Sequence, residues 1–444
     1  EEQTRRGISL RHFDELNDIA DHCTVCRKCL NPCPVDIDYG EVTIKIRNVL
    51  EAWQQKRKNM GAKLAVQYLT LSDYRPIQAY YKGLFRHGFR AQKAASRLLR
   101  MLEKPVKGEV PKPTHGRMAF KTQVRHSLNK PLPSVPKNTL RGLLGLGDPR
   151  YVPIIRNPDK VNEESEAVFF FPGCGAERLH SQIGLATLAL LYHLGVQTVV
   201  PPKFLCCGYP QKTSGQFQEA KRIITQNSVL FHRIANTLNY MDIKHVVIDC
   251  GTCLAQLETY ELDNIFPGNR LIDIHEFLAE KGVSAKDSLA EENYIYHDPC
   301  HSPMKYSNVN KILQSLTGLD VPVSDRCCGE AGTLSVSRPD IATQVRFRKE
   351  LELKKNLIEL NEIDMSQNNN PLVSDEHYLK KESRNTKILT SCPVCLQGLN
   401  RYRDDIGVRT TYIVIELAEK LLGKNWQKDF IKEAKARGIE RVLL

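Results

Sequence analysis

Two sets of five cysteines, spaced in the same way, constrain this 444-residue chain more than any other feature. Each set follows the pattern C…C-C-G…C-x2-C. The first consists of Cys174, Cys206, Cys207, Cys250 and Cys253, and the second of Cys300, Cys327, Cys328, Cys392 and Cys395. With four more cysteines near the N-terminus they account for all 14 in the chain. Because no cysteine is left over, the repeat predicts two copies of one metal-binding unit.

The start of the chain bears on the chemistry of these cysteines. Its first residues, EEQTRRGISL, contain no apolar stretch of the kind that a secretory signal needs. Disulfides are therefore not expected, and clustered cysteines fit metal ligands better. The chain also begins without Met, so we expect it to be processed or to be a piece of a longer polypeptide. No apolar run is long enough to predict a transmembrane helix.

Four predicted strands run toward members of the two sets. The apolar segments AVFFF, HVVI, NYIYH and KILT precede Cys174, Cys250, Cys300 and Cys392. Helical patterns separate them, as in HSQIGLATLALLYHLG and RPDIATQVRFRKELELKKN. Strands that alternate with helices predict repeated α/β units with parallel, doubly wound sheets. In such sheets ligands gather at the carboxyl ends of the strands, where these cysteines lie.

Five thiolates in each unit leave the type of metal site open at this point. They are one more than a cubane [4Fe–4S] cluster needs, so the extra sulfur bridges two irons, serves a cluster of another shape or is a spectator. Adjacent residues such as Cys206 and Cys207 point apart in an extended chain, which suits two different irons. Zinc bound through the C-x2-C pairs and buried structural cysteines are the alternatives.

A different cysteine pattern lies near the N-terminus. Cys23, Cys26, Cys29 and Cys33, followed by Pro34, form the C-x2-C-x2-C-x3-C-P run that is typical of [4Fe–4S] ferredoxins. In two-cluster ferredoxins the fourth cysteine of such a run serves the other cluster. The fourth cysteine here either completes the cluster of its own run or belongs to one whose remaining cysteines lie upstream of the first residue.

The rest of the N-terminal half divides into two predicted segments. Helical patterns over 9–20 and 39–54 flank the cysteine run, so residues 1–53 are expected to form a helical, ferredoxin-like domain. Residues 54–165 are expected to form a connector whose prolines interrupt any long helix. Much of the net charge of +12 lies in this connector. It is either solvated or in contact with anionic lipid headgroups or an acidic partner, and nucleic acid is not predicted because no nucleic-acid-binding motif accompanies the charge.

The combination of motifs resembles a known family. The repeated cysteine sets, with FPGCG and YHDPCH at the strand ends, resemble the CCG (cysteine-rich) domains of heterodisulfide reductase. They also resemble the iron–sulfur subunit of glycolate oxidase and the C-terminal iron–sulfur part of bacterial FAD-linked oxidase fusions. The resemblance covers residues 166–444 and implies a first CCG domain over 166–290 and a second, with C-terminal helices, over 291–444. In heterodisulfide reductase such a five-cysteine set holds a non-cubane [4Fe–4S] cluster.

The resemblance implies an iron–sulfur electron-transfer module with no catalytic residue of its own. Electrons would come from FAD on a partner or upstream domain that oxidises a 2-hydroxyacid such as lactate or glycolate. They would leave to a quinone or another carrier, with the protein in the cytoplasm or peripheral on the inner face of the membrane. A disulfide reductase is the alternative of the same family, and a zinc-stabilised structural or binding protein is the alternative of another class.

A few polar residues beside the cysteines are also candidates. His297 and His301, with Asp298, flank Cys300 and are expected to bind the cofactor, by hydrogen bonds to cluster sulfur or as proton carriers, although a polar turn also explains them. Other polar residues are expected to be exposed, namely Glu330, Arg178 and His180. No G-x-G-x-x-G after a strand, Walker A or G-x-S-x-G motif is present, so no nucleotide site or hydrolase triad is predicted.

Overall fold

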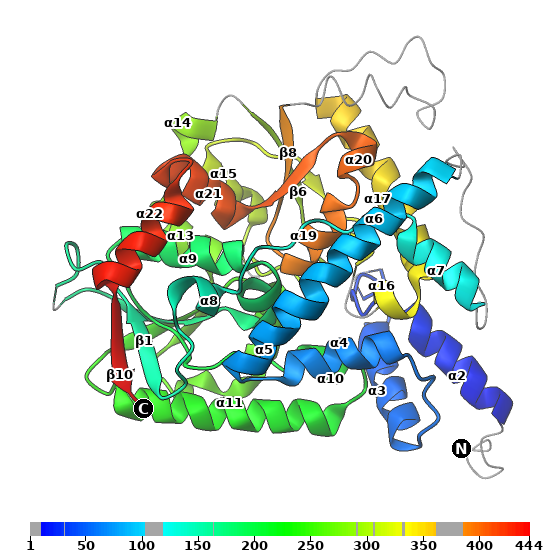
Figure 1. Ribbon diagram of the computed structural model, residues 1–444, viewed down its shortest axis with the longest axis horizontal. Helices are drawn as coiled ribbons and strands as arrows, with labels where there is room; N and C mark the ends of the chain where they lie inside the picture. Colours follow the sequence, from blue (N-terminus) through cyan, green and yellow to red (C-terminus); the bar gives the residue numbers. More distant parts are fainter. Residues whose placement is uncertain are drawn as a thin grey trace.

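The computed structural model describes residues 10–30, 32–102, 119–162, 164–289, 292–304, 307–330, 334–360 and 385–444. Two β-sheets with helices on their faces make up most of the structure, and the N-terminal helices α2 (Leu10–His22) and α3 (Tyr39–Ala52) lie at one side of them (Figure 1). The arrangement confirms the α/β fold class predicted from alternating strands and helices. The sequence also predicts a surface insertion in the second unit at the polar stretch MSQNNNPLVSDEHYLKKESRN, which falls almost entirely outside the described residues.

The first sheet has the strand order β10-β1-β3-β2-β4-β5. Its strands are β1 (Tyr151–Ile155), β2 (Ala167–Phe171), β3 (Gln197–Val199), β4 (Ile243–Ile248), β5 (Arg270–Asp273) and β10 (Ile439–Leu443). The strands from β3 to β5 are parallel, as predicted, whereas β1 pairs antiparallel with both β3 and β10. The central strand β2 is buried along its whole length, which explains its continuous apolar run.

The second sheet repeats the parallel part of the first. Its strands β6 (Asn293–His297), β7 (Val323–Ser324), β8 (Thr386–Thr390) and β9 (Arg409–Tyr412) lie in the order β7-β6-β8-β9 and are all parallel. This order matches the order β3-β2-β4-β5 in the first sheet. In the first sheet the chain crosses from β2 to β3 on one side and from β4 to β5 on the other, and β6 and β8 connect to β7 and β9 in the same way in the second sheet. The point between the two directions is the switch point at which α/β proteins bind ligands. Each cysteine set begins at that point.

The helices around the sheets also repeat. The first unit has α9 (Ser181–His193), α11 (Phe217–Thr237), α12 (Gly251–Leu257) and α13 (Ile274–Glu280), and the second has α15 (Val309–Thr317), α17 (Pro339–Leu360), α19 (Pro393–Asn400) and α21 (Ile413–Leu422). Shorter helices are α10 (Tyr209–Thr213), α14 (Lys286–Leu289), α16 (Leu334–Ser337), α20 (Arg403–Ile406) and α22 (Trp426–Glu433). Single turns are η2 (Gly175–Leu179), η3 (Glu258–Tyr260), η4 (Leu262–Asn264) and η5 (Ala434–Gly438).

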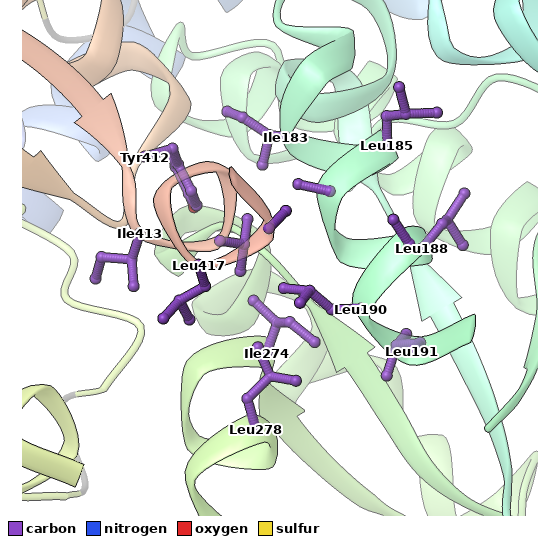
Figure 2. Packing of buried hydrophobic residues seen from close by; sticks show 14 of the residues in the cluster. Ile183, Leu185, Leu188, Leu190, Leu191, Ile274, Leu278, Tyr412, Ile413 and Leu417 are labelled. Carbon is purple, nitrogen blue, oxygen red and sulfur yellow. The ribbon is translucent and has the colours of Figure 1, made fainter. Parts of the chain in front are cut away.

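A shared hydrophobic core joins the two units. α9 is apolar on nearly every side because it is buried between them. Leu190 of α9, Ile274 of α13 and Leu417 of α21 belong to one buried cluster, and Figure 2 shows these side chains close together. α9 and α13 belong to the first unit and α21 to the second. The apolar area buried here therefore stabilises the pair of units together.

The basic segment expected to be a partly irregular connector is largely helical. The N-terminal part of the chain forms α2 (Leu10–His22), α3 (Tyr39–Ala52), α4 (Met60–Thr70), α5 (Tyr74–Tyr80), η1 (Tyr81–Phe85), α6 (Arg86–Leu102), α7 (Phe120–Leu128) and α8 (Leu140–Leu144). The helices α2 and α3 match the two predicted beside the ferredoxin-like run. The prolines at 131, 133 and 136 fall between α7 and α8, so they interrupt neither helix.

The sequence also predicts a helical C-terminal tail over 411–444, and the structure is helical there only in part. α21 and α22 agree with the prediction, but residues 439–443 form β10 instead. This strand pairs antiparallel with β1, with Leu443 opposite Tyr151. The pairing partner is remote in the sequence, so no local pattern could reveal it. The last residues of the chain thus complete the first sheet.

Candidate metal centres

The first cysteine set gathers at the carboxyl ends of β2 and β4. Cys174 follows β2, Cys250 immediately precedes α12, and Cys253 lies in the first turn of that helix. Cys206 and Cys207 lie in the loop before α10. Thiol contacts join the five in the order Cys174–Cys206–Cys207–Cys253–Cys250. All five residues predicted for this site are therefore together.

Two glycines allow the backbone to collect these sulfurs. Gly173 has a φ of 61°, and a Cβ on it would lie only 2.8 Å from the sulfur of Cys253. Gly208 has a φ of 88° and turns the chain from the vicinal pair into α10. Residues with a side chain are strained in this left-handed region. The glycines of the PGC and CCG motifs are thus required by the local fold.

The second set repeats the arrangement at the ends of β6 and β8. Its thiols contact one another in the order Cys300–Cys327–Cys328–Cys395–Cys392. In both units the first member of the vicinal pair contacts the cysteine after the first strand. The second member contacts the C-x2-C motif. The expectation that vicinal sulfurs serve different neighbours agrees with this geometry.

Because the thiols are closely packed, the pKa values of neighbouring cysteines shift in opposite directions. Hydrogen bonds from Cys206 and Cys253 lower the pKa of Cys207 to about 6, whereas contact with Cys207 and Cys250 raises the pKa of Cys253 well above its ordinary value. In the second set, Cys300 and Cys328 lower the pKa of Cys327 to about 3. Thiolates this close repel one another. All five can be ionised together only around a positively charged centre such as iron.

A buried tyrosine lies behind each vicinal pair, and the sequence patterns considered above did not identify it. Tyr260 donates a hydrogen bond to the carbonyl of Cys207 at 2.9 Å, and Tyr402 donates one to the carbonyl of Cys328 at 3.3 Å. Both tyrosines follow the last cysteine of their set in the spacing C-x2-C-x6-Y. This shared spacing is the signal that could have found them. Each hydroxyl holds the backbone from which the vicinal sulfurs project.

The loops that carry the two sets face each other. A Cβ on Gly175 would lie 2.7 Å from the ring of Pro393. In the matching contact, Gly251 packs so closely against the carbonyl of His301 that only glycine fits. Each of these four residues directly follows a cysteine at a strand end. The two cysteine sets therefore lie on either side of one interface.

The ferredoxin-like run docks against both units. Arg47 of α3 donates hydrogen bonds to the carbonyl of Cys23 at 2.7 Å and to that of Thr213 in α10 at 2.8 Å. Lys28 forms an ion pair with Asp325 at 2.9 Å, beside the second vicinal pair. These contacts hold the run against the loops that follow the first vicinal pair and precede the second.

One thiol of the run reaches the second set. A hydrogen bond from Cys300 lowers the pKa of Cys26 to about 5. Nε2 of the neighbouring His301 lies 3.0 Å from the carbonyl oxygen of Val25 and 3.0 Å from the hydroxyl of Tyr209. His301 thus contacts the ferredoxin-like run and the first unit from its place in the second. It lies at the junction of all three groups of cysteines.

The other three cysteines of the run are half-buried or exposed. The N–H groups of Val25 and Ile37 donate to the sulfurs of Cys23 and Cys33, each at 3.3 Å. Cys29 is exposed. Hydrogen bonds to sulfur are one of the means by which proteins tune iron–sulfur centres. Val25 has a φ of 56°, which is strained for a β-branched residue.

His297 lies within the second set. Its ring is 0% exposed, and one ligand nitrogen lies within 4.8 Å of the sulfurs of Cys328 and Cys395. Burial, with the nearby charges of Lys349 and Lys28, lowers the pKa of His297 well below its ordinary value. The ring is therefore neutral at pH 7. The geometry brings this predicted cofactor-binding residue among the sulfurs.

Glu330 is buried, although the sequence pattern predicted a solvated loop residue. Its carboxylate pairs with Arg401 at 3.0 Å and Arg346 at 3.3 Å. Although burial alone would raise its pKa, the two guanidinium groups hold the pKa of Glu330 below its ordinary value. The expectation was wrong because both partners come from distant segments of the chain.

Arg178 and His180 were also expected at the surface, and both are buried. Arg178 donates hydrogen bonds to the carbonyls of Tyr68 and Leu71, at 2.7 Å and 2.6 Å. These carbonyls belong to the basic segment, so Arg178 fastens that segment to the first unit. As for Glu330, the expectation of exposure was wrong because the partners are remote in the sequence.

A cavity of about 370 Å³ lies beside the first set. Cys206 lines it, together with apolar side chains that include Leu69 and Leu71. Lys203, Arg222 and Arg233 contribute positive charge to its lining. The cavity could therefore admit a small molecule that has an apolar body and an anionic group.

The donor chemistry of the three groups fits iron–sulfur clusters. Each five-membered set consists of thiols that contact one another at the switch point of a sheet, largely away from solvent. Backbone N–H groups reach sulfur in the ferredoxin-like run and, at 3.5 Å, from Gly329 to Cys327. The combination of His297, Cys328 and Cys395 also suits zinc.

Comparisons with known proteins agree with this chemistry. Residues 168–258 and 294–362 match the Cysteine-rich domain family (CCG), and residues 400–444 match a domain of unknown function (DUF3400). An uncharacterized iron-sulfur protein of Methanococcus maripaludis is 29% identical over 195 residues, which are 43% of this chain and 37% of that protein. The chain thus spans only about a third of the length of this relative.

Two bacterial relatives are covered more fully. The probable glycolate oxidase iron-sulfur subunit of Bacillus subtilis is 24% identical over 352 residues, covering 75% of this chain and 72% of that protein. Lactate utilization protein A of Oceanobacillus iheyensis is 28% identical over 197 residues, covering 40% of this chain and 76% of that protein. These relatives support an iron–sulfur protein associated with an oxidoreductase. Two stretches of the chain thus match the cysteine-rich (CCG) domain family, and the chain is similar to iron–sulfur proteins, as its cysteine repeat predicts.

Proposed function

We propose that this chain is the iron–sulfur electron-transfer module of an FAD-linked 2-hydroxyacid dehydrogenase. The observation that carries the proposal is that the three groups of cysteines adjoin. Cys26 contacts Cys300, and the loops after the strand-end cysteines of the two units touch at Gly175 and Gly251. Electron transfer needs redox centres that lie close together, and the contacts between the groups support a series of neighbouring sites.

The contacts suggest an order along the series. The ferredoxin-like run touches the second set, and the second set faces the first. The first set adjoins the cavity that Cys206 lines. We therefore propose that electrons pass along this series, with Cys26 near one end and Cys206 near the other. Iron–sulfur clusters, when bound, would supply one-electron transfer. The chain's own residues hold the thiolates in place, exclude water from them and set their surrounding charge.

The donor and acceptor are proposed from the relatives. The names of the two bacterial relatives refer to glycolate oxidase and lactate utilization, which favours a flavin that oxidises a small 2-hydroxyacid. Oxidation of the acid would belong to FAD on a partner or another domain, because nothing in the described residues offers a dinucleotide-binding motif. A quinone or another carrier would receive the electrons.

A disulfide reductase is the second candidate, and the cavity favours it. A disulfide with an anionic group fits the mixture of apolar and basic residues in the lining. Two electrons and two protons would convert it to two thiols. The electrons would come from the reduced module, and the protons from solvent that reaches the open cavity.

Peripheral membrane contact is proposed on the basis of α6. This helix is rich in arginine and carries exposed Leu98, Met101 and Leu102 near its C-terminal end. A basic helix with exposed apolar side chains suits an anionic lipid surface. Across the residues that the structure describes, no helix is both long and apolar enough to span a bilayer. Sedimentation with anionic and neutral vesicles tests the proposal, and binding to neither kind of vesicle would reject it.

The central test is the composition and redox behaviour of the chain purified without oxygen. We expect a brown protein that contains iron and acid-labile sulfide, with EPR signals that appear on reduction. Cys253→Ser and Cys395→Ser should each remove the signal of one set and leave the other as a matched control. Colourless protein that contains zinc would reject the proposal.

Electron transfer itself is tested with small reactants. Reduced flavin should reduce the protein, and a water-soluble naphthoquinone should then reoxidise it. Cleavage of a small disulfide by the pre-reduced protein, without any flavoprotein, would favour the second candidate. Failure with flavin, quinone and disulfide alike would reject both candidates.

A further inference from the structure

A buried histidine distinguishes the second cysteine set from the first. His297 is the last residue of β6 and precedes Cys300 by three positions. The matching residue, three positions before Cys174, is Phe171 at the end of β2. Both side chains are 0% exposed. The two units therefore place an imidazole and a phenyl ring at the same point of a repeated framework.

The imidazole of His297 is close enough to share an ion with two thiols. Its ligand nitrogen and the sulfurs of Cys328 and Cys395 all lie within 4.8 Å of one another. Three donor atoms at such separations can contact one metal centre. Among the described residues, neither ring nitrogen has a hydrogen-bond partner of normal geometry. A buried polar group without a partner costs free energy unless something else binds it.

The backbone of Ser324 acts on the ring of His297, although it makes no hydrogen bond of normal geometry with either nitrogen. Ser324 pairs with His297 across β6 and β7, and its backbone acts on the ring as a weak hydrogen-bond acceptor. A neutral imidazole has a single N–H. When that N–H faces Ser324, the other nitrogen presents a lone pair toward the sulfurs. Thiolates repel a lone pair unless a metal lies between them, and metal-binding histidines commonly donate their other N–H to a carbonyl.

We propose that His297 is an iron ligand of the second site, which then has five thiolates and one imidazole as donors. The first site has thiolates alone. The inference deepens the proposed function and rests on it, because iron must occupy the site. Neutral nitrogen donors raise the reduction potential of an iron–sulfur centre. The second site is thus the stronger electron acceptor of the two, and it is the one that Cys26 contacts.

Nitrogen hyperfine spectroscopy on the full chain, purified without oxygen, tests the ligand directly. The protein is labelled with 15N-histidine, reduced and examined by pulsed EPR. We expect a histidine nitrogen coupled to the cluster in the unsubstituted protein, its loss in His297→Gln and its retention in Phe171→Leu. His297→Cys, which offers a thiolate instead, should keep the iron, lose the coupling and show a lower midpoint potential for the second site.

The outcomes separate this inference from the proposed function. Iron and sulfide without any histidine coupling would overturn the ligand and leave the electron-transfer module intact. A coupling that persists in His297→Gln would also overturn it, because another histidine would then be its source. Absence of iron from the unsubstituted protein would overturn both. If His297→Gln does not fold, the labelled unsubstituted protein and His297→Cys still decide the question.

Discussion

The residues behind the two vicinal cysteine pairs differ more than the cysteines themselves. In the first unit, α11 contributes the neutral Asn227, which donates a hydrogen bond to the carbonyl of Cys206 at 2.8 Å. In the second, α17 contributes Arg346 and Lys349, both buried. The framework of strands, glycines and tyrosines repeats, but the charge around it does not. Because surrounding charge sets the potential of an iron–sulfur centre, the same scaffold can hold two sites of different potential.

The largest effect should come from breaking the buried ion-pair group of the second unit. Glu330→Gln leaves two buried guanidinium groups without their shared carboxylate, so we expect the free energy of unfolding to fall by about 3–5 kcal/mol. Glu177→Gln is the matched change in the first unit, where Glu177 pairs with Arg141 at 2.6 Å. Arg141 also donates to the carbonyls of Leu146 and Pro201. Because Glu177 contacts one guanidinium group where Glu330 contacts two, Glu177→Gln should cost less, about 1–3 kcal/mol.

Urea unfolding over a range of pH sharpens this comparison. The pKa of Glu330 is held below its ordinary value by Arg401 and Arg346 against the effect of burial, so its contribution to stability is full above about pH 4.5 and declines as the pH falls. Burial raises the pKa of Glu177, so its contribution is full below about pH 4.5 and declines as the pH rises. This account would be contradicted if the loss of unfolding free energy changed with pH in the same direction in Glu330→Gln and in Glu177→Gln.

A smaller effect is expected from one cation near the second site. Lys349 is 0% exposed and pairs with Glu352 at 2.7 Å, and the thiols of Cys328 and Cys395 act on its charge. A unit charge about 8 Å from a redox centre contributes about 2 kcal/mol at an effective dielectric constant of about 20. Lys349→Met should therefore lower the midpoint potential of the second site by on the order of 100 mV.

The potential of the first site serves as an internal control for that substitution. Lys355→Met is the matched variant on the same helix, because Lys355 is largely exposed and pairs with Glu359 at the surface. It should leave both potentials unchanged. An equal shift of both sites in Lys349→Met would show that the charge does not distinguish them.

The smallest effect concerns the part of the framework that repeats. Tyr260→Phe and Tyr402→Phe each remove a hydroxyl that donates to a vicinal cysteine carbonyl. Each should lower the free energy of unfolding by about 1 kcal/mol. Urea denaturation measures both. A large loss in one variant and none in the other would break the equivalence of the two tyrosines.

Much of the framework could be predicted from local sequence. Long apolar runs that end at cysteines identified β2, β4, β6 and β8, and helical periodicity identified the long helices between them. The strands β5 and β9 were not identified because RLID and RTTY are short and partly polar. The helices of the basic segment were underestimated because its prolines interrupt the chain between helices.

In the candidate sites, too, some features could be predicted from local sequence and others could not. The sulfur groups followed from spacing alone, since strand ends in a parallel sheet converge. The burial of Glu330 and Arg178 could not be foreseen, because it depends on partners that only the folded chain brings near. The two tyrosines were within reach, since comparing the repeats beyond their cysteines reveals them.

The position of β10 has a consequence for how the protein is made. This strand covers the outer edge of β1, so the first sheet keeps an open edge until residue 443 has been synthesised. Open strand edges invite pairing with other chains. A ribosome that stalls near the end would release a chain that contains every cysteine but leaves the outer edge of β1 in the first sheet unpaired. Dividing the chain near residue 290 to obtain separate halves would create the same defect.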